Sequence, residues 1–352
     1  MKKILIIQPH QFGYLVDSYM WAKYLKDSCS VTVLCYNQKY PVMKEDGVSV
    51  RYVSLEGCGI LRILKFLLSA LLLVLRSDVT IVEYFRKCEF IRVLCPFKKI
   101  ILDIRTLSVN CDEGIRSLQD SELRHACSYF KHVTVISKGV RDKLGIQDAR
   151  ILPLGAESVS LESKKYQELH LLYIGTLTNR NIEQTILGFK IFCENNQDTR
   201  LKYSIVGDGN GNELEKLKKL VVDLNLEHHV ILHGRKPHSE IAHFFEECNV
   251  GVAFIPIVPY YEYQPSTKIF EYIASGLFTI ATRTDANKEI ISEKNGILID
   301  DKPESFADAL EEIRVMGDKI NTDTIQKTLS SYTWECIVRE NLKQFIDNCS
   351  ND

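Results

Sequence analysis

Residues 169–175 read LHLLYIG, a short apolar run that ends on Gly175. A run of this length bounded by glycine is typical of a buried β-strand. It follows a polar stretch, 156–168, that shows no apolar period, and after it an alternation of apolar runs and helical stretches starts afresh. We therefore predict two α/β domains joined by a linker.

The part of the chain before this linker has the same alternation. Short apolar runs occupy 2–8, 31–35, 79–82, 99–103 and 132–136. Runs of this kind separated by helical stretches predict a parallel sheet covered on both faces. Ligands of such sheets bind beyond the carboxyl ends of the strands, so we expect the active site in a cleft between the two domains.

The length and composition of the chain limit the classes of function that it can have. The chain has 352 residues, more than one hydrophobic core usually spans, and a net charge of -2, which argues against a nucleic-acid binder. Its eleven cysteines show no CxxC or zinc-ligand spacing, and residues 1–7 are too short for a signal-peptide core. We expect reduced thiols in a cytoplasmic protein.

One stretch is unusually apolar. Residues 66–75 carry nine apolar side chains in ten positions, and Arg62, Lys65 and Arg76 flank them. Ten residues cannot span about 30 Å of hydrocarbon as a helix. Two interpretations stay open: a buried helix of the first domain, or a helix over 60–76 that dips into a membrane surface and is held there by its basic flanks.

The clearest chemical signal is the segment 265–276, PSTKIFEYIASG. Ser266 and Thr267 are expected to supply a capping hydroxyl and free amide groups at a helix N-terminus, which attracts a diphosphate. Lys268 adds a cation, and Glu271, three residues later on the same face, suits ribose hydroxyls. The alternative is a capped helix with an ordinary surface Lys–Glu pair.

Three glycine-containing loops follow neighbouring strands of the second half. A glycine there lets the chain turn under a phosphate, an arginine can bind the phosphate with two N–H groups, and a histidine or amide can contact a nucleobase. A GxGxG string over 207–211 departs from the dinucleotide pattern, so NAD binding is not expected. The residues of these loops that we select are Gly175, Thr176 and Arg180; Gly207; and His233, Gly234 and Arg235.

Taken together, these strings resemble the donor-binding half of retaining glycosyltransferases of family GT4, over residues 169–300. The matching strings are Tyr173–Gly175, Ile205–Gly209, His233-Gly234, Lys268–Gly276, Glu289–Ile291 and Asn295–Leu298. The resemblance implies the α/β fold called GT-B, in which two doubly wound, Rossmann-like domains face each other across a cleft. It also implies that a terminal helix, which begins here at Trp334, crosses back to the first domain.

The resemblance implies a division of the chain. Residues 1–155 would bind the acceptor, 156–168 would be the linker, 169–325 would bind the nucleotide sugar, and 326–352 would pack back on the first domain.

Roles for single residues follow from the same resemblance. Glu271 would bind the ribose, and Arg180 and Lys268 would hold the diphosphate with amides near Gly175 and Ser266. In the first domain, Gly13 would approach the donor, and Asp103, beside Arg105 at a strand end, would act directly in catalysis.

Two positions depart from the family pattern. Tyr263 stands where relatives often have a glutamate, and Thr176 stands where they often have an arginine. Glu262 and Gln264 are the candidate substitutes for that glutamate.

The implied reaction moves a hexosyl group from a nucleoside-diphosphate sugar to a glycan or lipid-linked acceptor, with retention of anomeric configuration. No cofactor is needed, and no metal ion, since no Asp-x-Asp clamp occurs. The enzyme would be cytoplasmic, with peripheral membrane contact through 60–76 and no nucleic-acid partner. The alternatives are a sugar-nucleotide 2-epimerase of the same fold and an inactive, transferase-like assembly partner.

Overall fold

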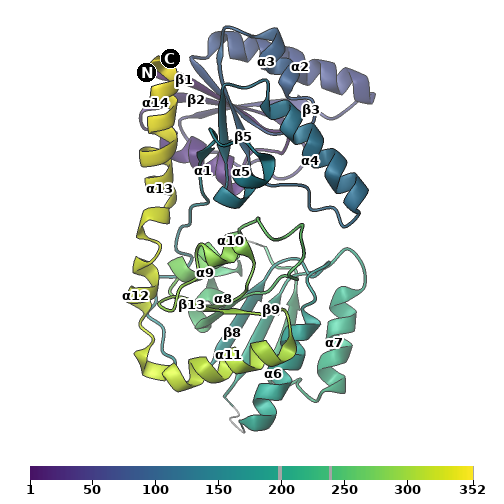
Figure 1. Cartoon of the computed structure of the whole chain (residues 1–352), viewed down its shortest axis with the longest axis vertical. Helices are drawn as coiled ribbons and strands as arrows, with labels where there is room; N and C mark the ends of the chain where they lie inside the picture. The colour runs from purple at the N-terminus through teal and green to yellow at the C-terminus, as the bar shows by residue number, and fades with distance from the viewer. Residues whose placement is uncertain (197–199, 238–239, 352) are drawn as a thin grey trace. The chain divides into compact units, whose positions relative to one another are not determined.

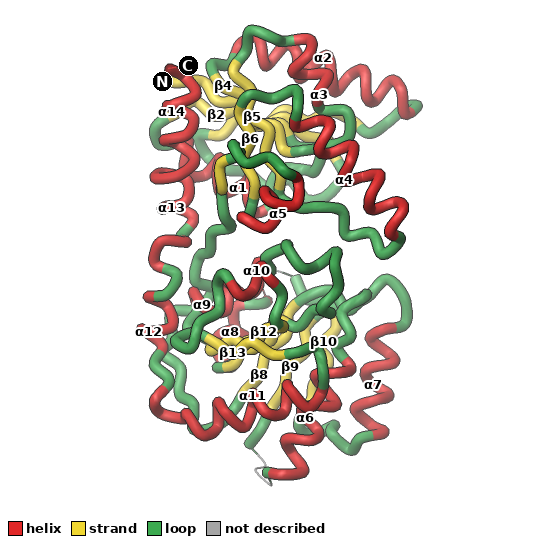
Figure 2. The backbone as a smooth tube through the Cα atoms, viewed as in Figure 1, coloured by secondary structure: helices red, strands yellow, loops and turns green. Residues whose placement is uncertain are grey.

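The computed structural model describes residues 1–196, 200–237 and 240–351. It divides into two compact units. The first consists of Met1–Gly155 and the segment from Tyr332 onward, and the second of Ala156–Ser331 (Figure 1). Each unit holds one parallel sheet with helices on its faces, drawn in yellow and red in Figure 2. The predicted pair of α/β sheets is confirmed.

The sheet of the first unit has seven strands in the order β3-β2-β1-β4-β5-β6-β7. Neighbouring strands pair in parallel, as their continuous apolar runs predict. The strands are β1 Lys2–Ile7, β2 Cys29–Asn37, β3 Val48–Ser54, β4 Val79–Glu83, β5 Lys99–Ile104, β6 His132–Val135 and β7 Arg150–Ile151. The helices between them are α1 Val16–Leu25, α2 Gly59–Arg76, α3 Glu89–Leu94, α4 Glu113–Cys127 and α5 Lys138–Leu144.

The last described segment packs on this first unit. It comprises α13 Trp334–Cys336, the π-helical turn η4 Ile337–Leu342 and α14 Lys343–Asn351, which contact α1 and β4. Trp334 is buried against Gly155, where an added Cβ would lie 2.6 Å from the indole ring. Lys2 Nζ donates to Asp347 Oδ1 over 2.6 Å. The segment is therefore a covering element of the first sheet.

The sheet of the second unit has six strands in the order β10-β9-β8-β11-β12-β13. The strands are β8 His170–Ile174, β9 Lys202–Val206, β10 Val230–Gly234, β11 Val250–Ala253, β12 Phe278–Thr282 and β13 Gly296–Ile299. The helices are α6 Glu183–Asn195, α7 Glu213–Asp223, α8 Ala242–Glu247, α9 Thr267–Ala274, α10 Asp285–Lys288, α11 Pro303–Met316 and α12 Thr322–Lys327. The sequence predicts the third of these helices from residue 239, which lies outside the described residues.

The stretch 156–168, expected to be a linker, packs against the second unit instead. Tyr166 is buried and its hydroxyl donates to the Gly276 carbonyl over 2.8 Å. Lys164 is also buried, and its ammonium donates to the Phe245 and Glu246 carbonyls. The second unit also continues past 325, through α12 to Ser331. Few of these contacts come from apolar side chains, so the sequence shows no apolar period from which this packing could be predicted.

The apolar stretch lies on α2, and it has two faces. Phe66, Ala70 and Val74, spaced four apart, are buried, and the Phe66 ring stacks on Tyr36 with centroids 4.4 Å apart. The opposite face is exposed. Among the described residues, no helix has the length and apolarity needed to cross a membrane.

Candidate functional site

The strand order of the second unit locates the site. β8 is the first strand of this sheet in the chain, and β11 lies on its other side from β9, so the winding direction reverses between β8 and β11. The loops that leave two such strands turn to opposite faces and leave a crevice at the carboxyl edge. The loop after β8 and the segment from β11 to α9 both reach this point.

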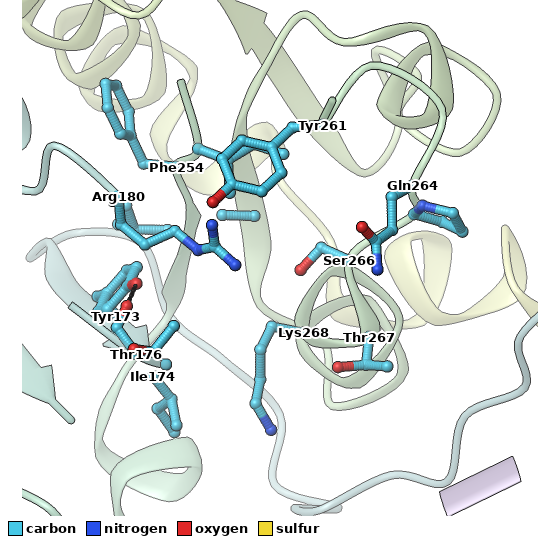
Figure 3. A pocket seen from close by; sticks show the side chains of 15 residues that line it. Tyr173, Ile174, Thr176, Arg180, Phe254, Tyr261, Gln264, Ser266, Thr267 and Lys268 are labelled. Atoms are coloured by element: carbon cyan, nitrogen blue, oxygen red, sulfur yellow. Dashed lines mark hydrogen bonds between the residues drawn. The ribbon is translucent and has the colours of Figure 1, made fainter. Parts of the chain in front are cut away.

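A pocket of about 290 Å³ occupies this crevice. It is lined by residues of both segments and by the first turn of α9 (Figure 3). Six residues selected from the sequence line it: Gly175, Thr176, Arg180, Ser266, Thr267 and Lys268. The fold thus brings into one pocket residues that are up to 93 positions apart in the sequence, from Gly175 to Lys268.

Arg180 is held against an aromatic ring. Its guanidinium carbon lies 4.5 Å from the centroid of the Tyr261 ring, and Figure 3 shows the side chain reaching toward Tyr261 from the loop after β8. Its Nη1 atom is buried and has no hydrogen-bond partner among the described residues. A stacked guanidinium keeps its N–H groups in a fixed plane, so Arg180 can donate to an anion in the pocket.

The N-terminus of α9 opens on the same pocket. Ser266 is at the N-cap position with extended backbone, but its side chain makes no capping hydrogen bond. The prediction that its hydroxyl caps the helix is therefore wrong. Without that bond, the Ser266 hydroxyl and the first-turn amides can serve a ligand. The positive end of the helix dipole adds to the attraction for a phosphate.

Lys268 and Glu271 form an ion pair one turn into α9. Lys268 Nζ lies 2.5 Å from Glu271 Oε2, and both side chains are about one-quarter exposed, 25% and 23%. Lys268 lines the pocket, whereas Glu271, its ion-pair partner, is not among the lining residues. The pair therefore presents a cation and, directly behind it, a hydrogen-bond acceptor.

Gly207 supports the pocket from the next strand. An added Cβ there would lie 1.8 Å from the Gly175 carbonyl oxygen, so only glycine allows this approach. The Gly207 amide donates to the Gly234 carbonyl over 2.9 Å, and the Leu177 amide donates to the Asp208 carbonyl over 2.9 Å. The loops after β8, β9 and β10 are thereby joined into one edge.

The third loop lies further along that edge. His233 Nε2 is 3.2 Å from Ser204 Oγ, its ring packs against Phe244, and burial lowers the pKa of its imidazole. Neither His233 nor Gly234, Arg235 or Gly207 is among the residues that line the pocket. Their contact with a donor stays a prediction.

The two candidate substitutes for the missing glutamate lie in different places. Gln264 lines the pocket, whereas Glu262 Oε1 accepts the Asp285 amide over 3.0 Å at the start of α10. Sequence reasoning missed Tyr261, Tyr173 and Phe254, which form the apolar wall. The cluster of three tyrosines at 260, 261 and 263, directly before the 265–276 segment, is the signal that could have indicated an aromatic wall.

In the first unit, Asp103 is buried rather than available to a substrate. Its side chain is 0% exposed, its Oδ1 accepts the Thr134 hydroxyl over 2.6 Å, and its Oδ2 lies 3.8 Å from Arg105 Nε. Arg105 also pairs with Asp17. The buried Asp103 carboxylate contacts Thr134 and Arg105, so the expectation that it acts directly in catalysis is not supported. Gly13, in the loop after β1, has φ of +90° and lies against Met43.

Glu83 joins this cluster from the adjacent strand, opposite Asp103 in the β4–β5 register. Its Oε2 and the Asp103 Oδ2 are both buried without a hydrogen-bond partner among the described residues. Burial raises the pKa of Glu83 to about 8, and the neighbouring Asp103 and Asp17 add to the rise while Arg105 opposes it. Burial also raises the pKa of Asp103 to about 6.

These pKa values make the first unit sensitive to pH. The folded state binds the Glu83 proton more tightly than the unfolded chain, so this contribution to stability is complete below the ordinary pKa of 4.5 and is lost as pH rises to about 8. Glu83→Gln should remove that slope and raise the free energy of unfolding at about pH 8 by roughly 2 kcal/mol.

Tryptophan fluorescence can measure this, because both tryptophans, Trp21 and Trp334, are buried in the first unit. Urea unfolding at about pH 5 and about pH 8 would give the slope for each variant. Glu113→Gln, on the exposed start of α4, is the control and should keep the wild-type slope. An unchanged slope in Glu83→Gln would contradict the prediction.

Comparison with known proteins agrees with this geometry. Residues 168–314 match the family model described as glycosyl transferases group 1. A comparison with curated protein sequences finds no match.

Solved structures share the fold at low sequence identity. Sucrose-phosphate synthase from Thermosynechococcus elongatus has a TM-score of 0.78 and 15% identity, over 100% of both chains. A glycosyltransferase from Rickettsia africae has a TM-score of 0.74 and 13% identity, over 100% of this chain and 99% of that one. Anabaena HepE in complex with UDP has a TM-score of 0.73 and 12% identity, over 99% of this chain and 100% of that one.

The fold is therefore that of the two-domain, GT-B-like proteins. The match over 168–314 covers the whole pocket described above, from Tyr173 to Lys268. The match of residues 168–314 to the glycosyl transferases group 1 model, together with the fold, supports a glycosyltransferase as the activity of the chain.

Proposed function

We propose that the protein is a retaining glycosyltransferase of the GT4 type. It takes a hexosyl group from a nucleoside-diphosphate sugar bound in the second unit and transfers it to a glycan or lipid-linked acceptor bound by the first. The single observation that carries the proposal is the convergence of Arg180, Lys268 and the α9 N-terminus on one pocket at the strand-order reversal.

The chemistry of the transfer explains this set of groups. Breaking the anomeric C–O bond leaves negative charge on the diphosphate, and fixed cations and amides that meet that charge lower the barrier. In this proposal Arg180 and Lys268 supply these cations, and no metal ion takes part. Glu271, behind Lys268, accepts hydrogen bonds from the ribose hydroxyls.

Two of the solved structures with this fold support the nature of the donor. Anabaena HepE is described in complex with UDP and in complex with UDP-glucose. A lipid-linked acceptor in polysaccharide synthesis fits the exposed apolar face of α2 in the first unit. Such a reaction would take place at the inner face of a membrane.

Donor binding to a Glu271 variant tests the proposal. We expect one of the UDP-, GDP- or dTDP-sugars to raise the melting temperature of the wild-type protein, and we expect Glu271→Ala to weaken its binding by about tenfold or more, since two charge-assisted hydrogen bonds are lost. Isothermal titration measures the affinity.

Glu215→Ala is the matched control, because Glu215 also pairs with a lysine three residues away, Lys218, on α7. It removes an equivalent helical ion pair far from the pocket in sequence and should leave donor affinity unchanged. Full affinity in Glu271→Ala would refute the ribose role. No affinity for any donor would favour the inactive assembly partner, and conversion of the donor sugar without acceptor would favour the 2-epimerase.

A further inference from the structure

The first unit carries an apolar surface that none of its described elements covers. On α2, Leu61, Leu64, Leu68, Leu72 and Leu75 recur every three or four residues, so they share one face of the helix. All five are more than half exposed, with Leu68 at 60% and Leu75 at 63%. This face points away from Phe66, Ala70 and Val74, which anchor the helix to the sheet.

The adjacent helix extends this surface. α3 contacts α2, and Figures 1 and 2 show the two side by side. Phe90, Val93 and Leu94 of α3 are half exposed, and Phe97, one turn beyond, is 98% exposed. A contiguous apolar surface of this size on a water-soluble unit marks an interaction site. We call this surface, made of the five leucines of α2 with Phe90, Val93, Leu94 and Phe97, the α2–α3 face.

The charges on α2 have one sign, and basic residues also border α3, although Arg86 pairs with Glu122 over 2.5 Å. Residues 57–77 contain no aspartate or glutamate, and Lys65 and Arg76, eleven positions apart and hence on one side of α2, follow the edge of the leucine stripe. Arg86 and Lys87 precede α3, and Lys98 follows Phe97. The one carboxylate of α3, Glu89, is buried and lies 3.8 Å from Lys87 Nζ.

From this arrangement we propose that the α2–α3 face docks on an anionic phospholipid surface. The leucine and phenylalanine side chains enter the boundary between headgroups and acyl chains, and the basic edge binds the phosphates. α2 lies in the plane of the surface, with Phe66, Ala70 and Val74 turned back to the protein. A second copy of the chain is a poorer occupant, since a two-fold interface would bring its basic edge against the same charges.

The proposal does not rest on the donor chemistry, because lipid binding can be measured without nucleotide. The purified 352-residue chain is sedimented with vesicles of phosphatidylcholine alone or of equimolar phosphatidylcholine and phosphatidylglycerol. We expect binding to the mixed vesicles at least about tenfold stronger than to phosphatidylcholine, and weaker binding at high salt.

Variants separate the two contributions. Leu68→Gln with Phe97→Ser should lower binding to the mixed vesicles by about tenfold or more, and Lys65→Gln with Arg76→Gln should lower it and remove most of the salt dependence. The matched controls carry equal changes on exposed residues of the second unit: Val222→Gln with Val315→Gln, and Lys216→Gln with Lys219→Gln. Both controls should bind as the wild type does.

Three results would overturn the proposal. The first is a wild-type protein that binds neither vesicle, and the second is an apolar variant that binds as well as its control. The third is a wild-type dimer without lipid that becomes monomeric in the Leu68→Gln, Phe97→Ser variant, which would assign the face to a second copy. Unchanged circular dichroism and melting temperature in every variant separate loss of binding from loss of folding, and unchanged donor affinity keeps the result separate from the transferase proposal.

Discussion

Replacement of Arg180 by alanine should lower the rate of sugar transfer by about 10²–10³-fold. The guanidinium faces the pocket from the loop after β8, and stacking on Tyr261 at 4.5 Å fixes its direction. A fixed cation that meets developing negative charge contributes about 2.7–4 kcal/mol to lowering the barrier in comparable sites. The loss should appear mainly in kcat, because the charge is greatest in the transition state.

Two further variants make this result specific. Arg180→Lys keeps the charge but loses the planar fork, so its activity should lie between the wild type and Arg180→Ala. Arg283→Ala removes an exposed arginine of the same unit that pairs with Asp300 over 3.1 Å, and it should keep wild-type activity. Steady-state kinetics with a fixed acceptor measures all three. Equal activity in Arg180→Ala and Arg283→Ala would remove Arg180 from the leaving-group site.

Replacement of Gly207 by alanine should destabilise the second unit by about 3 kcal/mol or more. A Cβ at this position would overlap the Gly175 carbonyl oxygen at 1.8 Å, and a backbone atom directly after the central strand β8 cannot move aside as a flexible side chain can. Because Gly175 lines the pocket, the displacement that relieves the clash should also weaken donor binding.

Gly317→Ala is the control. Gly317 has φ of +46° and ψ of −123°, and no atom of the described residues lies within 4 Å of an added Cβ, so the change should cost only the backbone strain of about 1–3 kcal/mol. Thermal unfolding followed by circular dichroism should show an early transition in Gly207→Ala that tryptophan fluorescence does not report, since both tryptophans lie in the first unit. Equal melting temperatures in the two glycine variants would contradict the clash.

The sequence predicts the two sheets well because buried parallel strands are continuous apolar runs, and LHLLYIG at 169–175 is a clear case. It predicts less where burial is polar. Lys164 and Tyr166 are fixed by hydrogen bonds to distant carbonyls, so the stretch that contains them was expected to be a linker. The α4 helix, Glu113–Cys127, is mostly polar and buries only Leu123, Ala126 and Cys127, all within its last five residues.

The residues of the pocket also differ in how well the sequence predicts them. Lys268 and Arg180 could be selected from the sequence because a cation after a strand or at a helix start has a chemical meaning of its own. Tyr261 could not, since its role depends on the guanidinium that it meets, 81 positions earlier in the chain. Asp103 was selected as a polar residue at a strand end, and only the packing around it shows that it is buried.

The two passes of the chain between its units also bear on how the protein is made. During translation, residues 1–155 emerge from the ribosome long before the segment that begins at Tyr332. That segment covers α1 and places Trp334 against Gly155. Until translation reaches it, the nascent first unit lacks its last covering layer, while the second unit, continuous from 156 to 331, is already complete. The half synthesised first is therefore the half that finishes folding last, and it is the one that a chaperone would need to shield.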